Sequence, residues 1–193
     1  DPEARCSPRT VRGLAASVAL VLVGERSRPD VLAVFAKIVS RIPAKLLLIG
    51  DGPDRGRIEK EVRECSLGDN IRFLGKLDAM EEILSVGDLF ILPSESESFG
   101  LAALEAMACQ VPVISSNTGG IPELNLHGVT GYMSEVGDTE DMAANALRLL
   151  SDENELTKFK KNALEQARRF DIKEVLPQYE ELYRRVIAEG VSI

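Results

Sequence analysis

Two glutamates, Glu97 and Glu105, lie eight positions apart in the stretch SESESFGLAALEAMACQVPVIS at residues 94–115. The stretch predicts a loop that carries Glu97, an apolar helix that carries Glu105, and then a strand. A helix N-terminus offers free amides and a positive dipole end to a diphosphate, and carboxylates accept hydrogen bonds from hydroxyl groups. This pattern predicts a sugar nucleotide, with its sugar at Glu97, its phosphates at the helix start and its ribose at Glu105. The alternative is that Glu95 and Glu97 are solvated loop charges and that Glu105 pairs with a basic side chain.

The helix of this stretch is predicted to begin near Phe99 or Gly100, with Ser98 as its N-cap. Between Gly100 and Cys109 the only charged residue is Glu105, so we expect the helix to be buried on most sides. A carboxylate in such a helix costs several kcal/mol unless hydrogen-bond donors meet it. Gly100 would let a ligand approach the backbone closely.

Residues 97–109 (ESFGLAALEAMAC), followed by VPVI at 111–114, resemble the E-x7-E signature of GT-B glycosyltransferases of the large family 4 type. Further motifs fall in that family's order and spacing, and the resemblance covers roughly residues 28–188. Those motifs are LIGDGP (48–53), IRFLG (71–75), DLFILPS (88–94), GGIPE (119–123) and GVTGY (128–132). Within the family, ESFG, GGIPE and VGD (136–138) are most similar to the enzymes that join N-acetylglucosamine to L-malate in bacillithiol synthesis.

The resemblance implies a retaining, metal-independent transfer from a nucleoside-diphosphate sugar, with UDP-N-acetylglucosamine favoured and with no cofactor. Glu97 would hold the transferred sugar as a catalytic residue, and Glu105 would hold the ribose. The loop with GGIPE would support the sugar pocket, and backbone groups near Phe73 would line the base pocket. The implied donor-binding set is Gly24, Gly50, Phe73, Gly75, Glu97, Ser98, Phe99, Gly100, Leu101 and Glu105. Taken alone, the glycine turns at Gly50 and Gly75 fit ordinary strand ends equally well, and Glu123 fits a helix-start carboxylate.

The loop at residues 24–28 departs from the family pattern. Relatives carry an Arg and a Lys here that point at the donor diphosphate, and those positions fall near Gly24 and Ser27, which are not basic. A departing diphosphate needs positive charge. Arg26 or Arg28 therefore takes this catalytic role, or the segment has diverged and transfer is weak or absent; Arg28 also fits an ordinary surface charge.

Composition excludes several other functions. The chain of 193 residues has a formal charge of −8, which argues against a general nucleic-acid or anionic-membrane surface. Three cysteines without metal or disulfide spacing favour a reducing, cytoplasmic setting, and the single His127 cannot form a histidine metal cluster. No apolar run reaches the roughly 18 residues of a membrane span. The chain begins with Asp1, which favours a fragment or a processed product.

Strands and helices alternate along the sequence. This order predicts an α/β fold, a Rossmann-like doubly wound parallel sheet with helices on both faces, which is one half of a GT-B fold. The expected strands are 14–23, 44–49, 70–74, 88–92, 111–115 and 131–135, and the expected helices are 28–42, 54–67, 80–86, 100–109, 140–150, 153–169 and 172–189. Residues 1–13 are expected to be an irregular arm, and residues 14–193 a single donor-binding domain that includes terminal helices at 153–189 in its outer layer. The resemblance implies that these terminal helices pack back toward the partner domain.

Ligands of such sheets bind at the carboxyl ends of the strands, near a topological switch point. The loops at Gly24, Gly50, Gly75, Ser94 and Asn117 all follow predicted strands, so we expect them to converge there. The resulting hypothesis is a glycosyltransferase donor domain that needs a separate N-terminal acceptor domain, and that turns over little by itself. Alternatives are a non-catalytic nucleotide-sugar-binding or regulatory module, and an epimerase or phosphorylase on the same architecture.

Overall fold

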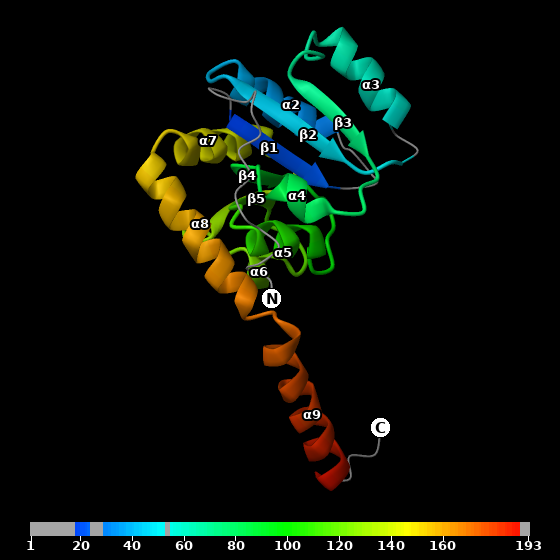
Figure 1. Ribbon diagram of the computed structural model, residues 1–193, viewed down its shortest axis with the longest axis vertical. Helices are drawn as coiled ribbons and strands as arrows, with labels where there is room; N and C mark the ends of the chain where they lie inside the picture. The colour runs from blue at the N-terminus through cyan, green and yellow to red at the C-terminus, as the bar shows by residue number, and fades with distance from the viewer. Residues whose placement is uncertain (1–17, 24–28, 53–54, 190–193) are drawn as a thin grey trace.

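A computed structural model describes residues 18–23, 29–52 and 55–189 of the chain. Its six strands form one parallel sheet in the order β3-β2-β1-β4-β5-β6 (Figure 1). The strands are β1 (Val18–Val23), β2 (Ala44–Ile49), β3 (Ile71–Gly75), β4 (Leu89–Leu92), β5 (Val113–Ser116) and β6 (Gly131–Ser134). The strand order reverses between β1 and β4, so the switch point lies between the loops that follow these two strands.

Helices cover both faces of the sheet, because side chains of a buried strand alternate between two apolar layers. One layer packs against α2 (Pro29–Val39), α3 (Arg55–Glu64) and α7 (Thr139–Leu150). The other packs against α4 (Met80–Leu84), α5 (Leu101–Ala108) and α6 (Ile121–Leu124). Neighbouring residues of β5 show the alternation, since Ile114 belongs to the first layer and Val113 to the second.

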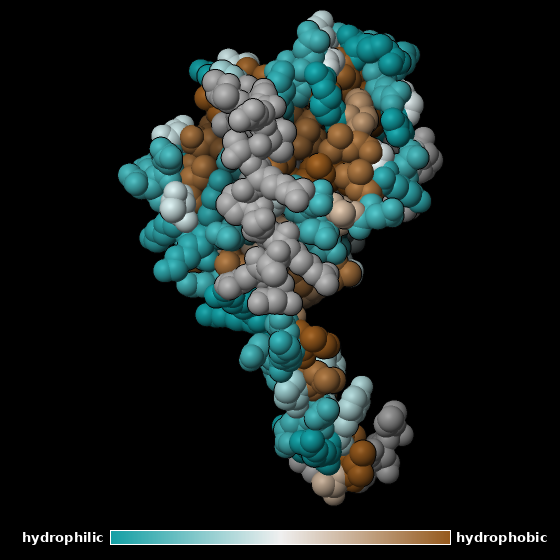
Figure 2. Space-filling view, in the orientation of Figure 1, coloured by the Kyte–Doolittle hydropathy of each residue, from teal (hydrophilic) through white to brown (hydrophobic). Residues whose placement is uncertain are grey.

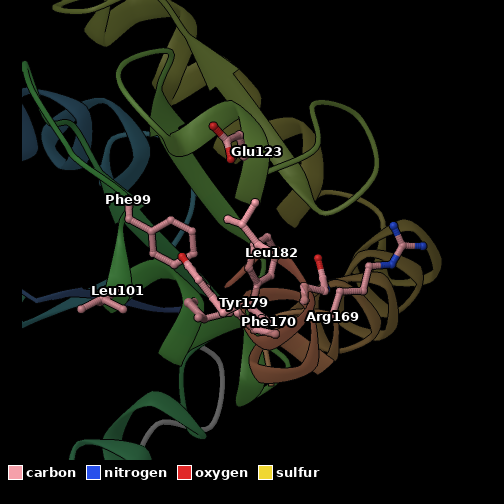
Figure 3. Close-up of a pocket in the computed structure, with 10 residues that line it drawn as sticks. Phe99, Leu101, Glu123, Arg169, Phe170, Tyr179 and Leu182 are labelled. Carbon is pink, nitrogen blue, oxygen red and sulfur yellow. The ribbon is translucent and has the colours of Figure 1, made fainter. Parts of the chain in front are cut away.

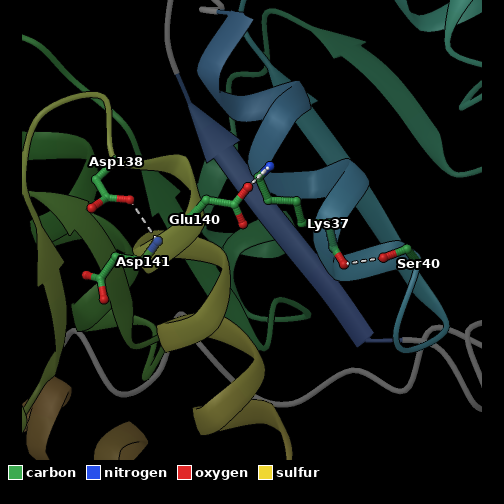
Figure 4. A network of polar contacts seen from close by, with 5 residues as sticks. All are labelled: Lys37, Ser40, Asp138, Glu140 and Asp141. Carbon is green, nitrogen blue, oxygen red and sulfur yellow. Dashed lines mark hydrogen bonds and ion pairs between the residues drawn. The ribbon is translucent and has the colours of Figure 1, made fainter.

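Helices α2 and α7 lie side by side on the first face, although they are far apart in sequence. Lys37 of α2 donates a hydrogen bond of 2.6 Å to the exposed Glu140 of α7 (Figure 4). At the start of α7, the Asp138 carboxylate accepts a hydrogen bond of 2.9 Å from the Asp141 amide, so Asp138 is the N-cap. Because α2 contacts β2 while α7 contacts β5 and β6, these two helices connect the two halves of the sheet.

Helix α8 (Glu153–Arg168) joins the two faces. Phe159 packs into the first layer beside Tyr132 of β6, whereas Ala163 and Ala167 pack into the second layer against α5. The helix therefore passes around the β6 edge of the sheet and ends near the start of α5, where Phe170 contacts Phe99.

Helix α9 (Ile172–Glu189) differs from the outer-layer position that the sequence predicts. It extends away from the sheet, and apolar residues at helical spacing remain exposed along it (Figures 1 and 2). These residues are Ile172, Leu176, Tyr179, Leu182, Tyr183, Val186 and Ile187. Its alternation of charged and apolar residues predicted an amphipathic helix, which the structure confirms, and its apolar residues face solvent rather than the sheet.

The predicted α/β architecture is confirmed, and the expected elements lie within a few residues of their predicted bounds, whereas the short helix α6 was not among the expected helices. Helices α2 and α3 both end three residues early, at Val39 and Glu64. The expected irregular arm at residues 1–13 lies outside the described residues, and the single-domain organisation stays a prediction.

Candidate functional site

Two loops on one side of the switch point pack directly against each other. The loop after β4 carries Glu97, and the loop after β5 carries Gly119 and Gly120. The amide of Gly120 donates a hydrogen bond of 3.2 Å to the backbone carbonyl of Glu97, and the hydroxyl of Thr118 donates one of 3.1 Å to the carbonyl of Glu95. The second loop therefore holds the backbone that carries Glu97.

Glycine is required at this contact. Gly119 has φ +56°, and a Cβ atom built on it would lie 1.7 Å from the carbonyl oxygen of Glu97. An L-residue disfavours that backbone conformation, and no side chain would fit between the two backbones. The glycine pair thus permits a backbone-to-backbone contact beneath Glu97, which agrees with the predicted support of the sugar pocket.

The start of α5 lies immediately after this contact. Gly100 is the N-cap with φ +92°, and no side chain among the described residues caps the helix. The sequence prediction that Ser98 is the N-cap is therefore wrong, because the left-handed turn at Gly100 places the helix boundary two residues later than the serine requires. Since the first amides of a helix have no intrahelical acceptor, the start of α5 is available to another acceptor.

The two glutamates differ in exposure. Glu97 is half-buried, whereas Glu105 is exposed on α5, on the same face as Leu101, whose exposed fraction is 66%. The expectation that α5 is buried on most sides is confirmed: Ala103, Ala106 and Met107 are buried, other apolar residues of the helix pack partly buried against the core, and only Leu101 and Glu105 are exposed. Glu105 therefore faces outward, where a ligand could reach it.

The pKa of Glu105 is raised above its ordinary value. Partial burial of its carboxyl group is the main cause, and the negative charge of Glu81 on α4 adds to it. Glu105 thus lies on the side of α5 that faces α4, in the direction of the β3 loop from which α4 follows. Among the described residues, no basic side chain contributes to this shift, so the basic partner of the alternative interpretation is not found in that part of the chain.

A second pair of loops meets on the other side of the switch point. The amide of Gly50, after β2, donates a hydrogen bond of 2.8 Å to the carbonyl of Gly75 at the end of β3. Phe73 is half-buried and packs beside the first apolar layer. The structure thus brings Gly50, Phe73 and Gly75 together, and it separately brings Glu97, Ser98, Phe99, Gly100 and Leu101 together at the start of α5.

The predicted residues Gly24, Arg26 and Arg28 lie outside the described residues. Glu123 lies in α6 and is exposed. His127 is exposed as expected, and its Nδ1 accepts a hydrogen bond of 3.0 Å from the Met133 amide. Glu123 therefore fits the interpretation as a helix carboxylate, and His127 fits the interpretation as an exposed loop residue.

A cavity of about 870 Å³ lies between the start of α5 and α9, and the sequence did not indicate it (Figure 3). Phe99 lines it and makes an edge contact with Phe170, with 5.4 Å between ring centroids. Tyr179 and Leu182 of α9 line its other side, and the charged end of Arg169 extends away from the other labelled side chains. The cavity is thus mainly apolar and adjoins the loop that carries Glu97.

Within residues 18–23, 29–52 and 55–189, no group of three or more His, Cys, Asp or Glu could hold a metal ion. Of the helices in this part of the chain, none is long and apolar enough to cross a bilayer.

The doubly wound sheet, with these loops at its carboxyl edge, is one half of the GT-B architecture of glycosyltransferases. The chain belongs to the group 1 glycosyltransferases, because the family model described as "Glycosyl transferases group 1" matches residues 20–166. It is 46% identical over 165 residues to N-acetyl-alpha-D-glucosaminyl L-malate synthase of Bacillus anthracis, a match that covers 83% of this chain and 42% of that protein. It is also 32% identical over 158 residues to a sulfoquinovosyl transferase of Arabidopsis thaliana, covering 79% of this chain and 30% of that one.

Solved structures agree with this family. Sucrose-phosphate synthase from Thermosynechococcus elongatus superposes with a TM-score of 0.79 at 31% identity, covering 90% of this chain and 46% of that one. HepE of Anabaena, solved in complex with UDP and glucose, gives a TM-score of 0.81 at 22% identity, with 95% and 52% covered. The chain spans less than half the length of the curated relatives named here.

Proposed function

We propose that this chain is the donor-binding half of a retaining glycosyltransferase that uses a UDP-sugar, with UDP-N-acetylglucosamine favoured. The observation that carries the proposal is the arrangement at the start of α5. There the Gly119–Gly120 loop supports Glu97, the helix start has no side-chain cap among the described residues, and Glu105 is exposed one turn further along.

These groups follow the order of the parts of a sugar nucleotide. Glu97 would accept hydrogen bonds from hydroxyls of the sugar, and the amides at the start of α5 would meet the diphosphate. Glu105 would accept hydrogen bonds from the ribose diol, and it lies toward α4, which follows the Gly75 loop where the base would bind. The donor would thus extend along the carboxyl edge of the sheet, across the switch point.

The name of the 46% identical Bacillus anthracis relative includes an N-acetylglucosaminyl group, which supports the proposed donor. In a retaining transfer, the bond between the anomeric carbon and the diphosphate oxygen breaks while the acceptor oxygen bonds to the same face of the sugar. The departing phosphate takes the proton of the acceptor hydroxyl. The protein contributes orientation and positive charge, and Arg26 or Arg28 is the proposed source of that charge.

Calorimetric titration with UDP, GDP and ADP tests the donor site. We expect selective UDP binding, which Glu105→Ala weakens about tenfold or more, because a hydrogen bond to a charged group contributes about 1.5–3 kcal/mol. Glu165→Ala is the matched control, since Glu165 is an exposed helical glutamate on α8. Absence of UDP binding, or equal binding by the Glu105 and Glu165 variants, would count against the proposal.

Acceptor binding is proposed to need a second, N-terminal domain. The exposed apolar residues of α9 and the cavity beside Phe99 support a surface that another domain covers, because large exposed apolar patches commonly mark interaction surfaces. We therefore expect the isolated 193 residues to bind nucleotide but to hydrolyse or transfer sugar very slowly. Turnover typical of a whole glycosyltransferase by this chain alone would refute the need for a second domain.

A further inference from the structure

The loops that follow β2 and β3 are joined by more than their backbone hydrogen bond. The pairing of these strands shifts register near its end, where Leu48 pairs with Phe73 and Ile49 pairs with Gly75. This irregularity leaves Leu74 without a partner in the register, as a β-bulge does. The end of β3 lies close to the first residue of α3.

That residue is Arg55, and its side chain crosses both loops. Its guanidinium carbon lies 5.9 Å from the centroid of the Phe73 ring. One terminal nitrogen, Nη1, lies 3.7 Å from the Asp51 carboxylate after β2, and a Cβ atom built on Gly75 would lie 3.7 Å from the same nitrogen. Arg55 therefore lies over the Phe73 ring at the end of β3 and forms an ion pair with Asp51 in the loop after β2.

The orientation of Arg55 is fixed by its own helix. Its Nε donates a hydrogen bond of 2.9 Å to Glu59, one turn further along α3. Two carboxylates, from Asp51 and Glu59, thus balance the single positive charge. Because its charge is already compensated, Arg55 is poorly suited to neutralise a diphosphate, but its planar fork is well suited to hold groups at fixed positions.

We infer that Arg55 is a positioning residue for the base end of the donor site, and that it sets the selectivity for the nucleobase. The inference rests on the proposed function. A base is distinguished by hydrogen-bonding groups at fixed spacing, and here those groups would come from the backbone near Phe73 and Gly75. By making a cation–π contact with Phe73 while pairing with Asp51, Arg55 keeps the two loops at one separation.

The experiment compares Arg55→Met and Arg55→Lys with Lys60→Met. Lys60 is the matched control, because it lies on the same helix and pairs with Glu64 at the same spacing, with both side chains exposed. Dissociation constants for UDP, GDP and ADP are measured by calorimetry, and the melting temperature by calorimetric scanning. Asp51→Asn is a second variant that keeps Arg55 and weakens its link to the β2 loop.

We expect Arg55→Met to weaken UDP binding about tenfold and to lower the ratio of UDP to GDP affinity, because displaced loops misplace the groups that read the base. Arg55→Lys should not restore that ratio, since lysine lacks the planar fork. Asp51→Asn should lower it as well, and this variant decides the matter if Arg55→Met does not fold. Lys60→Met should leave it unchanged.

Two results would overturn the inference while leaving the proposed function intact. The first is wild-type UDP selectivity in both Arg55→Met and Asp51→Asn. The second is an equal loss of affinity for all three nucleotides, which would show a general effect on the fold or on the charge. If the unmodified chain binds none of the three nucleotides, the proposed donor site fails and this inference fails with it.

Discussion

Replacement of Gly119 by alanine tests whether the two loops at the site act as one unit. A Cβ atom at this position would lie 1.7 Å from the carbonyl oxygen of Glu97, and the residue has φ +56°. Left-handed backbone costs an L-residue roughly 1–2 kcal/mol, and overpacking costs about 1–3 kcal/mol. If the loops shift only as far as the methyl group requires, we expect a total loss of roughly 2–5 kcal/mol, or a fall in melting temperature of roughly 4–20 °C for a chain of this size.

The alternative response is separation of the loops. The loss of stability would then be smaller, but the backbone that carries Glu97 would lose the hydrogen bond from Gly120 and move. In that case affinity for UDP-N-acetylglucosamine should fall toward the affinity for UDP, because only the sugar contacts are lost. Scanning calorimetry and titration with both ligands therefore separate the two responses.

Gly137→Ala is the matched control. Gly137 also has a positive φ, +82°, but a Cβ atom there would meet nothing within 4 Å. Both substitutions remove the same freedom from the unfolded chain and introduce the same kind of backbone strain, so their difference isolates the loop contact. Equal stability and equal sugar-nucleotide affinity in the two variants would refute the reasoning.

Three further predictions concern single side chains. Asn125 is fully buried and its side chain donates to Ser115 and to two backbone carbonyls; Asn125→Ala should lower stability by about 2–4 kcal/mol in urea unfolding, because buried polar groups lose their partners. Glu105→Gln should unfold at a higher temperature than the wild type at neutral pH, with the difference vanishing in acid, because the raised pKa of Glu105 means that its ionised form disfavours folding. Asp138→Ala should cost about 1 kcal/mol through loss of the cap to Asp141, measured by thermal unfolding.

Each of these predictions has a contrary result. An Asn125 variant within about 0.5 kcal/mol of the wild type would show that its hydrogen bonds are replaced, since that is the usual range for surface changes. A Glu105→Gln variant that is less stable at neutral pH would contradict the direction of the pKa shift. Asp138→Asn should retain the cap, so equal losses from Asn and Ala would argue against the capping bond.

The architecture was predictable because helices of this same domain cover the apolar residues on both faces of the sheet. Strand β4, for example, is a run of four buried apolar residues, Leu89 to Leu92, and such a run fits a strand covered on both faces. Turn residues such as glycine and proline then mark where one element ends and the next begins. The family motifs predicted which loops form the donor site, and the structure brings four of those loops together in two pairs.

Local details of the site were not predictable from residue types. Ser98 is a favourable N-cap by composition, but the helix begins after Gly100 because the backbone turns through a left-handed conformation there. Which residue adopts that conformation depends on the contact between two loops that are distant in sequence. Arg55 was missed because its contact with Phe73 joins two segments that are distant in sequence, although its ion pair with Asp51 spans only four residues.

The exposure of several apolar side chains was also not predictable, for a different physical reason. Leu101 on α5, and Leu176 and Tyr183 on α9, are apolar and yet exposed. Apolar residues occur wherever a surface is buried in the complete protein, whether it is buried by the same domain or by another one. The chain covers only 42% of its Bacillus anthracis relative, so a pattern read as the core of one domain can instead belong to an interface. Helix α5 then serves two purposes, since most of its residues pack against the sheet while Leu101 and Glu105 face outward, where the proposed donor site lies.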